Sequence, residues 1–553
     1  MADASVIIVG GGPVGLGAAL ELARFGIASV VLEQRDSMSR HPKTRNLNTR
    51  TMEIAHGWGN GLYRRLRGVD TPPGWKSPIR FMDAIVGDKE AQIETPGFEG
   101  PGPQISPAQP VMSSQDLFEP ILRDAAAATG LVDLRFGHQV TAVPLGSGEQ
   151  DTEASVAVHV TATGQTYTLT GDAIVAADGV DSTVRRQLGI ALAGEQALNH
   201  FVNGYFHSDI ERYLAHRSGV GFFIANPDAV GALMPLDANG RWMCQIGVAP
   251  EQWSRELWDD ERVRRWVRGA VGVDDLDVDV KSIGLWQINA TIAERLVQGR
   301  VLLCGDAAHQ FPPTGGLGLN TGLQGMHNAM WKLALCIHGL ASWSLINTYD
   351  DERRGPAVAA ITQSLDNARN IARIAAAAYN PSGAELTAED ITRETRRYGN
   401  HLGVELGAAY RSAAVIDDGT TPPAVDDTYA DYAPSATPGC RAPHIALGSP
   451  HEPVSTLDLF GPGFTLLAGP AGQDWRTVAA DAARRLAIPV ASYAVGDPGL
   501  DDPSDTFADL YGISDAGAVL VRPDGYVAWR CATGPADDAQ LMTALQQILD
   551  RRP

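Results

Sequence analysis

Three glycines near the N-terminus have the spacing of a phosphate-binding turn. Gly10, Gly12 and Gly15 form the pattern GxGxxG. In such a loop the first glycine permits a tight turn, the second lets phosphate oxygens approach the backbone, and the third lets a helix pack on a strand. Glu33 follows where a carboxylate accepts hydrogen bonds from ribose hydroxyls. The pattern predicts dinucleotide binding, disfavours NADP at this position, and leaves FAD and NAD open.

Two later motifs favour a flavin. Ile174–Arg185 reads IVAADGVDSTVR and contains Asp178, and Arg300–His309 reads RVLLCGDAAH and contains Asp306 before the loop Pro312–Asn320. An aspartate at the end of a strand can bind a ribityl hydroxyl, and the glycines of the loop let the backbone lie against a flat ring. The helix expected after the loop directs its positive end toward that ring.

The elements that must position these residues begin with a βαβ unit. Apolar, β-branched Ser5–Val9 and Ser29–Leu32 predict strands, and Pro13–Phe25 has helical periodicity. This order implies a parallel sheet. Further helices are expected over Gln115–Ala128 and from Asn320 to about Leu340.

Two aromatic-rich, alternating stretches predict antiparallel strands of an inserted domain. They are Ile79–Thr95 and about Phe201 to Gln287, the second interrupted by a charged helical piece at Glu251–Gly269. Ile416–Gly439 is rich in Pro, Asp, Thr and Ala and predicts a linker. A small α/β domain is expected after it, from strands Phe464–Ala468 and Ala518–Arg522, a strand through Trp529, and helices near Trp475–Leu486 and Asp537–Leu549.

Composition excludes several classes of protein. The chain has 553 residues and a formal net charge of -21, which argues against nucleic acid and anionic membrane as main partners. It contains no apolar run of membrane-spanning length and no secretory signal pattern, and no metal site is expected. The five cysteines include no CxxC pair, which argues against disulfide or zinc frameworks and fits a reducing cytoplasm.

The GxGxxG, DG and GD motifs, in this order, resemble the class A (single-component) FAD-dependent aromatic monooxygenases, the para-hydroxybenzoate hydroxylase-like family, over residues 1 to about 400. HPKTRNLNTRTMEI (His41–Ile54) resembles the branch of phenol, chlorophenol and polyketide hydroxylases. PGCRAPH (Pro438–His444), DLFGPGFTLL (Asp458–Leu467) and VLVRPDGYVAWR (Val519–Arg530) resemble the C-terminal domain of that branch. There the family has a thioredoxin-like domain, and this copy without CxxC should have no redox role.

The fold class implied is α/β, with a GxGxxG FAD-binding Rossmann-like domain, an inserted antiparallel β-sheet substrate domain and a C-terminal thioredoxin-like domain. The FAD-binding domain is expected in three parts, 1–78, 111–190 and, with a helical region, 289–415. The substrate domain is expected in two parts, 79–110 and 191–288, followed by the linker 416–439 and the thioredoxin-like domain 440–553.

The resemblance implies roles for cofactor-binding residues. Gly10, Gly12 and Gly15 would contact the FAD pyrophosphate and Glu33 the ribose. Gln115 would lie beside the flavin and Asp306 at the ribityl chain. Gly318, Leu319 and Asn320 would lie along the pyrimidine edge of the flavin, and Lys43 falls where relatives usually place Arg near the cofactor. The other expected cofactor-binding residues are Pro13, Val14, Gln34, Arg35, Arg45, Asp178, Pro313 and Gly316.

Substrate contacts are expected from the inserted sheet, where alternate residues face opposite sides. No catalytic base is assigned. Tyr205, His207 and Gln245 are candidates, and so is Arg45, which falls about where phenol hydroxylases place a catalytic Asp. The candidate substrate-binding residues are Phe222, Phe223, Met234, Pro235, Trp286 and Pro312.

The resemblance implies hydroxylation of a phenolic or polycyclic aromatic, polyketide-like substrate. NAD(P)H would bind transiently and reduce FAD, O2 would add at flavin C4a, and the hydroperoxide would transfer its distal oxygen to the substrate. Baeyer–Villiger or epoxidising chemistry on a polyketide, and a flavin-binding protein without oxygenase activity, remain alternatives. A monomer or homodimer is expected.

Overall fold

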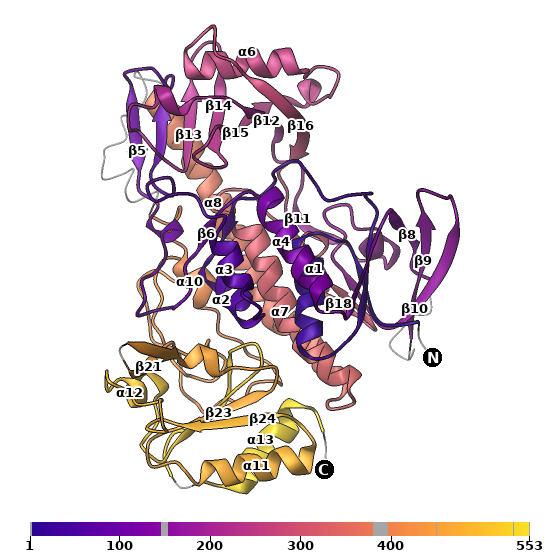
Figure 1. Cartoon of the computed structure of the whole chain (residues 1–553), viewed down its shortest axis with the longest axis vertical. Helices are drawn as coiled ribbons and strands as arrows, with labels where there is room; N and C mark the ends of the chain where they lie inside the picture. Colours follow the sequence, from indigo (N-terminus) through magenta and orange to yellow (C-terminus); the bar gives the residue numbers. More distant parts are fainter. Residues whose placement is uncertain (1–2, 145–152, 380–395, 450, 535, 552–553) are drawn as a thin grey trace.

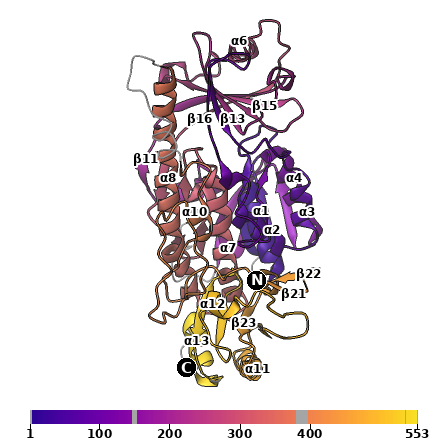
Figure 2. The same ribbon diagram turned by 90° about the vertical axis from the view of Figure 1, so that its left-hand side faces the viewer.

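The computed structural model describes residues 3–144, 153–379, 396–449, 451–534 and 536–551. A sheet domain lies at one end of the long axis, the domain with the glycine motif lies in the middle, and the C-terminal domain lies at the other end (Figure 1). Helix α8 (Thr348–Tyr379) follows this axis from the middle domain toward the sheet domain (Figure 2). No helix in the described ranges is long and apolar enough to cross a bilayer.

The middle domain contains the predicted parallel sheet. Ile8 lies opposite Val31 on one side and Val175 on the other, so β1 lies between β2 and β10 in the sheet. The carboxyl ends of the parallel strands bring Gly10, Glu33 and the residues after β10 and β19 to one edge. The strand order is β18 (Val297–Gln298), β19 (Val301–Leu303), β10 (Thr166–Ala176), β1 (Ala4–Val9), β2 (Ser29–Glu33) and β7 (Val132–Phe136), with β9 (Ala154–Val160) on β10 and β8 (His138–Ala142) on β9.

Helix α1 (Pro13–Arg24) packs closely against α7 (Leu317–Ile337) because a glycine lies at their contact. A Cβ added at Gly17 would lie 2.8 Å from Met326 Cε. The apolar faces of both helices join the central strands in one core. The remaining helices here are α2 (Thr49–Gly57), α3 (Leu62–Arg67), α4 (Gln115–Ala128), α5 (Thr183–Gln187) and α10 (Leu402–Leu406). Two small sheets complete the domain: β3 (Asn46–Leu47) with β6 (Val111–Met112), and β11 (Leu192–Glu195), β17 (Ala290–Ala293) and β20 (His309–Gln310).

The inserted domain is a seven-stranded sheet whose outer face is covered by α6 (Asp260–Val271). It differs from the expected antiparallel sheet in one pairing, because β4 and β13 run parallel, with Ile79 opposite Gly221. These strands come from distant parts of the chain, so no hairpin turn sets their direction. The order is β16 (Asp279–Gln287), β12 (His200–His207), β15 (Arg241–Val248), β14 (Val230–Pro235), β13 (Gly221–Ala225), β4 (Ile79–Met82) and β5 (Glu90–Ile93).

The C-terminal domain has a four-stranded mixed sheet with helices α11 (Trp475–Leu486) and α13 (Asp538–Ile548) packed in its core. The segment expected as a linker pairs with this sheet. The Ile416 N–H donates to the Ala528 carbonyl over 2.7 Å, and the Gly439 N–H donates to the Val527 carbonyl over 2.8 Å. The strand order is β24 (Val490–Ala494), β23 (Phe464–Ala468), β25 (Ala518–Val521) and β26 (Val527–Cys531), beside the hairpin β21 (Ala446–Ser449) and β22 (Glu452–Ser455) and helix α12 (Phe507–Tyr511).

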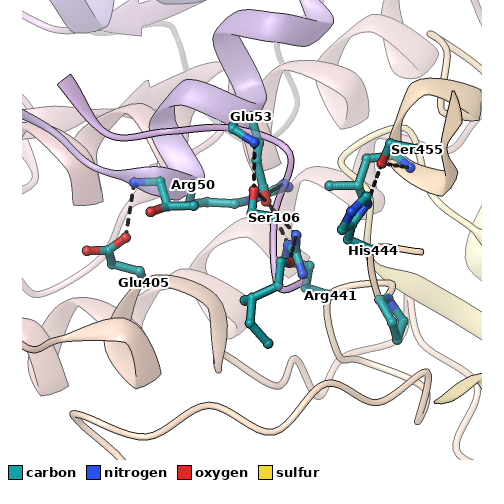
Figure 3. A network of polar contacts seen from close by, with 12 residues as sticks. Arg50, Glu53, Ser106, Glu405, Arg441, His444 and Ser455 are labelled. Carbon is teal, nitrogen blue, oxygen red and sulfur yellow. Dashed lines mark hydrogen bonds and ion pairs between the residues drawn. The ribbon is translucent and has the colours of Figure 1, made fainter. Parts of the chain in front are cut away.

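A buried polar network joins the C-terminal and middle domains. Glu53 on α2 accepts hydrogen bonds from Arg441, from Ser106 over 2.6 Å and from Arg50 over 2.8 Å (Figure 3). Arg50 also donates to the carbonyl of Asp524 over 2.5 Å. Since buried ion pairs are stable only when their hydrogen-bonding groups are satisfied, this network fixes α2 against the C-terminal domain.

Candidate active site

A cavity of about 2090 Å³ lies between the carboxyl edge of the parallel sheet and the seven-stranded sheet. Single ligand pockets commonly measure about 300–1,000 Å³, so this space can hold a dinucleotide together with a second molecule. We call the part lined by the glycine turn, Glu33 and Asp306 the glycine-motif half. We call the part lined by the strands of the seven-stranded sheet the sheet half.

The glycine turn has the geometry that its sequence predicts. Gly10 has a φ of +105°, and a Cβ there would lie 2.2 Å from the Ala177 carbonyl oxygen. A Cβ at Gly15 would lie 2.0 Å from the Gly10 carbonyl oxygen, so this glycine serves helix packing and does not line the cavity. Gly12 has no protein atom within 4 Å of such a Cβ and borders the cavity.

The N-terminus of α1 is open toward the cavity. Gly12 is the N-cap residue and supplies no side-chain hydrogen bond, while Pro13 occupies the first turn. Free N–H groups and the helix dipole make such an end a binding site for anions. Pro13 and Val14 line the cavity here, as the sequence predicts for cofactor-binding residues.

Glu33 is held in its ionised form beside the glycine turn. It accepts hydrogen bonds from the Gly11 N–H over 2.8 Å and from the Arg35 backbone and side chain over 3.0 and 2.8 Å. Burial alone would raise its pKa, but these bonds and the Arg35 charge lower it below the usual value. A ribose hydroxyl could therefore donate to this carboxylate while sharing it with Arg35.

The two aspartates of the later motifs both line the cavity. The Oδ2 atom of Asp178 accepts the Val184 N–H at 3.2 Å, while Oδ1 is buried without a partner in the described structure. Asp306 is exposed to the cavity, the protein atoms around it raise its pKa, and the charge of Lys43 opposes this shift. A hydroxyl-bearing ligand would supply hydrogen bonds to these carboxylates, so they fit a group such as the ribityl chain of FAD.

Gln115, at the start of α4, borders the cavity and donates to Glu119 one turn later. Burial raises the pKa of the Glu119 carboxyl, and the hydrogen bond from Gln115 opposes this. The sequence interpretation missed Glu119, although the spacing of four residues on a helix was a signal. The bond leaves the amide oxygen of Gln115 available as an acceptor.

The loop Pro312–Asn320 borders the cavity, but Asn320 does not. Its side chain is 1% exposed, donates to the Gly316 carbonyl over 2.7 Å, and accepts the Asn48 N–H at 2.9 Å. The side chain of Asn320 therefore braces the loop from behind, and the expected place of Asn320 along the pyrimidine edge of the flavin stays a prediction. The predicted residues that do line the cavity are Gln34, Arg35, Lys43, Arg45, Pro313, Gly316, Gly318 and Leu319.

Four of the six expected substrate-binding residues line the cavity: Phe223, Met234 and Trp286 in the sheet half, and Pro312 in the loop Pro312–Asn320. Phe222 points to the opposite face of β13 and is 0% exposed in the core under α6. Pro235 lies outside the lining but its carbonyl accepts a hydrogen bond from Arg45. These two expectations are wrong because the sequence does not show which strand face points inward.

The candidate acid–base residues lie in two places. Gln245 and Arg45 line the cavity, whereas Tyr205 and His207 do not. The Tyr205 hydroxyl lies 2.9 Å from His207 Nε2 and accepts a hydrogen bond from Arg241 over 3.0 Å. Tyr205 and His207 therefore belong to a polar cluster outside the cavity, and their proposed catalytic role is not supported by position.

The structure adds Tyr398 to the cavity wall. Burial raises its pKa to about 12, while the charge of Arg45 and a hydrogen bond from the Gly315 backbone act in the opposite direction. No sequence pattern marked this lone aromatic residue. It connects the 396–399 segment with the loop Pro312–Asn320.

Comparison with known proteins agrees with this geometry. Residues 3–364 match the FAD binding domain family, and residues 435–552 match the aromatic-ring hydroxylase C-terminal family. The chain is 34% identical to a 4-methyl-5-nitrocatechol 5-monooxygenase of a Burkholderia species, over 99% of this chain and 98% of the relative. It is 33% identical to aklavinone 12-hydroxylase of Streptomyces purpurascens, over 99% of both chains. The structure of the flavin-dependent monooxygenase PieE with FAD and substrate matches with a TM-score of 0.90 and 32% identity over 100% of both chains.

The chain belongs to the FAD-binding aromatic-ring hydroxylase family. It is an FAD-dependent monooxygenase with a resemblance to phenol and polyketide hydroxylases over its whole length. The predicted fold class, family and cofactor are confirmed.

Proposed function

We propose that the protein hydroxylates a phenolic or polycyclic aromatic, polyketide-like substrate and consumes NAD(P)H and O2. The observation that carries this proposal is the single cavity that joins the glycine turn to the aromatic-lined sheet half. A cofactor in one half and a flat substrate in the other would share one continuous cavity. Its volume favours a multi-ring substrate over a single ring.

Cofactor binding would use the glycine-motif half. We propose that Gly12 and the N-terminus of α1 hold the pyrophosphate, that Glu33 binds the ribose, and that Asp306 binds the ribityl chain. Gln115 would accept a hydrogen bond beside the flavin. When bound, FAD supplies the activation of O2 after reduction by NAD(P)H.

The contribution of the chain's own residues would be to orient the substrate and exclude water. Phe201 and Trp286 stack with ring centroids 4.9 Å apart and border the sheet half. Phe223 and Met234 add apolar wall. Such a surface suits the face of a flat ring, while Gln245 offers an amide to one of its oxygen substituents.

The similarity to enzymes named for aromatic substrates supports this class of substrate. One relative is named for 2,4-dichlorophenol and is 30% identical over 100% of this chain. Another similar structure, at 31% identity and a TM-score of 0.85, is a hydroxylase with bound FAD and aklavinone. We propose a phenolic polycycle as the substrate class.

The test is NAD(P)H oxidation by the FAD-loaded protein under air, with a panel of phenols and hydroxylated polycyclic aromatics. We expect stimulation by a member of the panel, and a product that is heavier by one oxygen and retains its rings. Product structure separates hydroxylation from ring-expanding oxygen insertion, which yields an ester or lactone. If no aromatic compound stimulates oxidation and no oxygenated product forms, the proposal is wrong.

Location and assembly complete the proposal. A reducing cytoplasm would suit the five cysteines, which are all free thiols. We propose a monomer or a homodimer, because residues of one chain line the cavity. Analytical ultracentrifugation of the FAD-loaded protein measures the assembly directly.

A further inference from the structure

Arg45 is held between the two domains that border the cavity. Its guanidinium donates to the Pro235 carbonyl over 2.6 Å and to the Val220 carbonyl over 3.0 Å. Its own carbonyl accepts the Ser113 N–H at 2.7 Å. Because a guanidinium has five N–H donors, two bonds to carbonyls leave others free to meet a ligand in the cavity that Arg45 lines.

The positive charge of Arg45 has no acidic partner in the described part of the chain. Among the described residues no carboxylate forms an ion pair with it, and Tyr398 is the one charged or titratable group that shifts its pKa. Burial lowers that pKa to about 10, which leaves Arg45 charged at neutral pH. None of the cavity-lining residues contributed by the seven-stranded sheet is an Asp or Glu. A half-buried cation without a counterion is costly, and a ligand with an anionic oxygen would supply the missing partner.

Arg45 also lies near the loop Pro312–Asn320, through Tyr398. Tyr398 lies within electrostatic range of Arg45 and beside the backbone of Gly315, and both lower its pKa against the effect of burial. Gly315 belongs to the loop Pro312–Asn320, which borders the same cavity. An oxygen atom bound by Arg45 would thus lie in the cavity that this loop borders.

We propose that Arg45 binds the substrate as an oxyanion, the ionised phenolic or enolic oxygen of an aromatic ring. This inference rests on the proposed function. The phenolic O–H bond breaks, its proton passes to water, and the electron pair stays on oxygen, so binding needs no further reactant. The negative charge makes the ring carbons ortho and para to that oxygen more electron-rich, which favours transfer of oxygen to them.

The test uses alizarin, a three-ring dihydroxyanthraquinone whose colour changes when it loses a proton. The dye is titrated with FAD-loaded protein, without NAD(P)H, at a pH near its own pKa, where free dye is a mixture of both forms. We expect bound dye to have the spectrum of the anion. The 2-methyl ether of alizarin, which lacks the acidic hydroxyl, should bind about tenfold or more weakly.

Three variants assign the effect to Arg45. Arg45→Met should weaken binding of alizarin about tenfold or more and give bound dye a neutral spectrum, while Arg45→Lys should keep the anionic spectrum. Arg64→Met removes an exposed arginine on α3 and should change neither property. FAD content is measured for each variant, because the comparison of dye and methyl ether in the unmodified protein tests the proposal even if Arg45→Met does not fold.

Two results would overturn the proposal: bound alizarin in its neutral form, or no binding tighter than that of its methyl ether. The proposed function fails in a different experiment, if no aromatic compound yields an oxygenated product. Anionic binding of alizarin without any oxygenation would therefore retain Arg45 as an oxyanion site and reject the hydroxylase proposal.

Discussion

The Arg522 guanidinium, in the C-terminal domain, lies 2.6 Å from the Glu352 carboxylate on α8, and both side chains are 0% exposed. Lys332 on α7 donates to the same carboxylate over 2.8 Å, and Arg522 pairs with Asp524 over 2.6 Å. The two cations hold the pKa of Glu352 well below its usual range, although burial opposes them. The contact between the domains therefore has a charged centre that water does not reach.

Removing Arg522 should destabilise the whole chain. Arg522→Met leaves Glu352 and Asp524 buried with fewer cationic partners, and we expect a loss of about 3–5 kcal/mol in the free energy of unfolding. Chemical denaturation of the FAD-loaded protein measures it. The exposed pair of Arg484 with Asp481 is the control, because Arg484→Met should cost less than about 1 kcal/mol. Equal losses in both variants would contradict a special role for the buried pair.

Glu53 should make stability depend on pH. Ion pairs with Arg441 and Arg50 lower the pKa of Glu53 to about 2, against the opposing effect of burial. A lowered pKa in the folded state adds stability that is full above the unfolded value near 4.5 and is lost as pH falls toward 2. Glu53→Gln should be less stable by about 3 kcal/mol at pH 7, and the difference should shrink in that acid range. A difference in melting temperature that is constant between these values of pH would contradict this.

Gly12→Ala should separate cofactor binding from folding. The added methyl group meets no protein atom within 4 Å and the φ of -77° suits alanine, so the melting temperature without FAD should not change. The methyl group enters the space proposed for the pyrophosphate, and we expect FAD affinity to fall about tenfold or more. Gly10→Ala is the contrast, since its Cβ would clash with Ala177 and should lower stability itself. If FAD affinity is unchanged in Gly12→Ala, the pyrophosphate does not bind beside Gly12.

Trp286→Ala should impair substrate binding. It removes one partner of the stack with Phe201 from the cavity wall, and we expect KM for the aromatic substrate to rise about tenfold. Tyr205→Phe is the matched control from the polar cluster outside the cavity, and steady-state kinetics should show its KM and kcat to be unchanged within about twofold. A larger change in KM or kcat in Tyr205→Phe than in Trp286→Ala would contradict the assignment of Trp286, and not Tyr205, to the substrate-binding wall.

The C-terminal thiols should be dispensable for turnover. Burial raises the pKa of Cys440 to about 11 and also raises that of Cys531, which keeps both thiols protonated and weakly nucleophilic at neutral pH. The double variant Cys440→Ser, Cys531→Ser should retain NAD(P)H oxidation and product formation. Loss of activity with an unchanged melting temperature would indicate a redox role after all.

Much of the fold was predictable because local patterns and global structure agree. The first strand, the glycine turn and Glu33 follow from spacing and periodicity alone. The face of the inserted sheet on which each side chain lies could not be predicted in this way. Phe222 and Phe223 are equivalent in sequence but lie on opposite faces. The sides of a strand differ only through what packs against them, here helix α6 on one side and the cavity on the other.

Contacts between residues that are distant in the sequence could not be predicted from sequence patterns either. Tyr398 reaches the cavity from a segment far from every motif. The segment 416–439 has the composition of a linker, yet Ile416 forms a backbone hydrogen bond to the C-terminal sheet. Composition describes what a segment can do alone, whereas these contacts depend on residues distant in sequence.

The placement of Asp524 also constrains how such enzymes can be recombined. Its carbonyl meets Arg50 on α2 and its carboxylate meets Asn328 on α7, the two helices that Asn320 joins behind the cavity. A hybrid that exchanges C-terminal domains between relatives would have to bring matching charges at positions 352 and 522 as well. The C-terminal domain, without CxxC, therefore depends on the middle domain through these buried polar contacts. A substitution on one side of the contact between the two domains calls for a compensating substitution on the other.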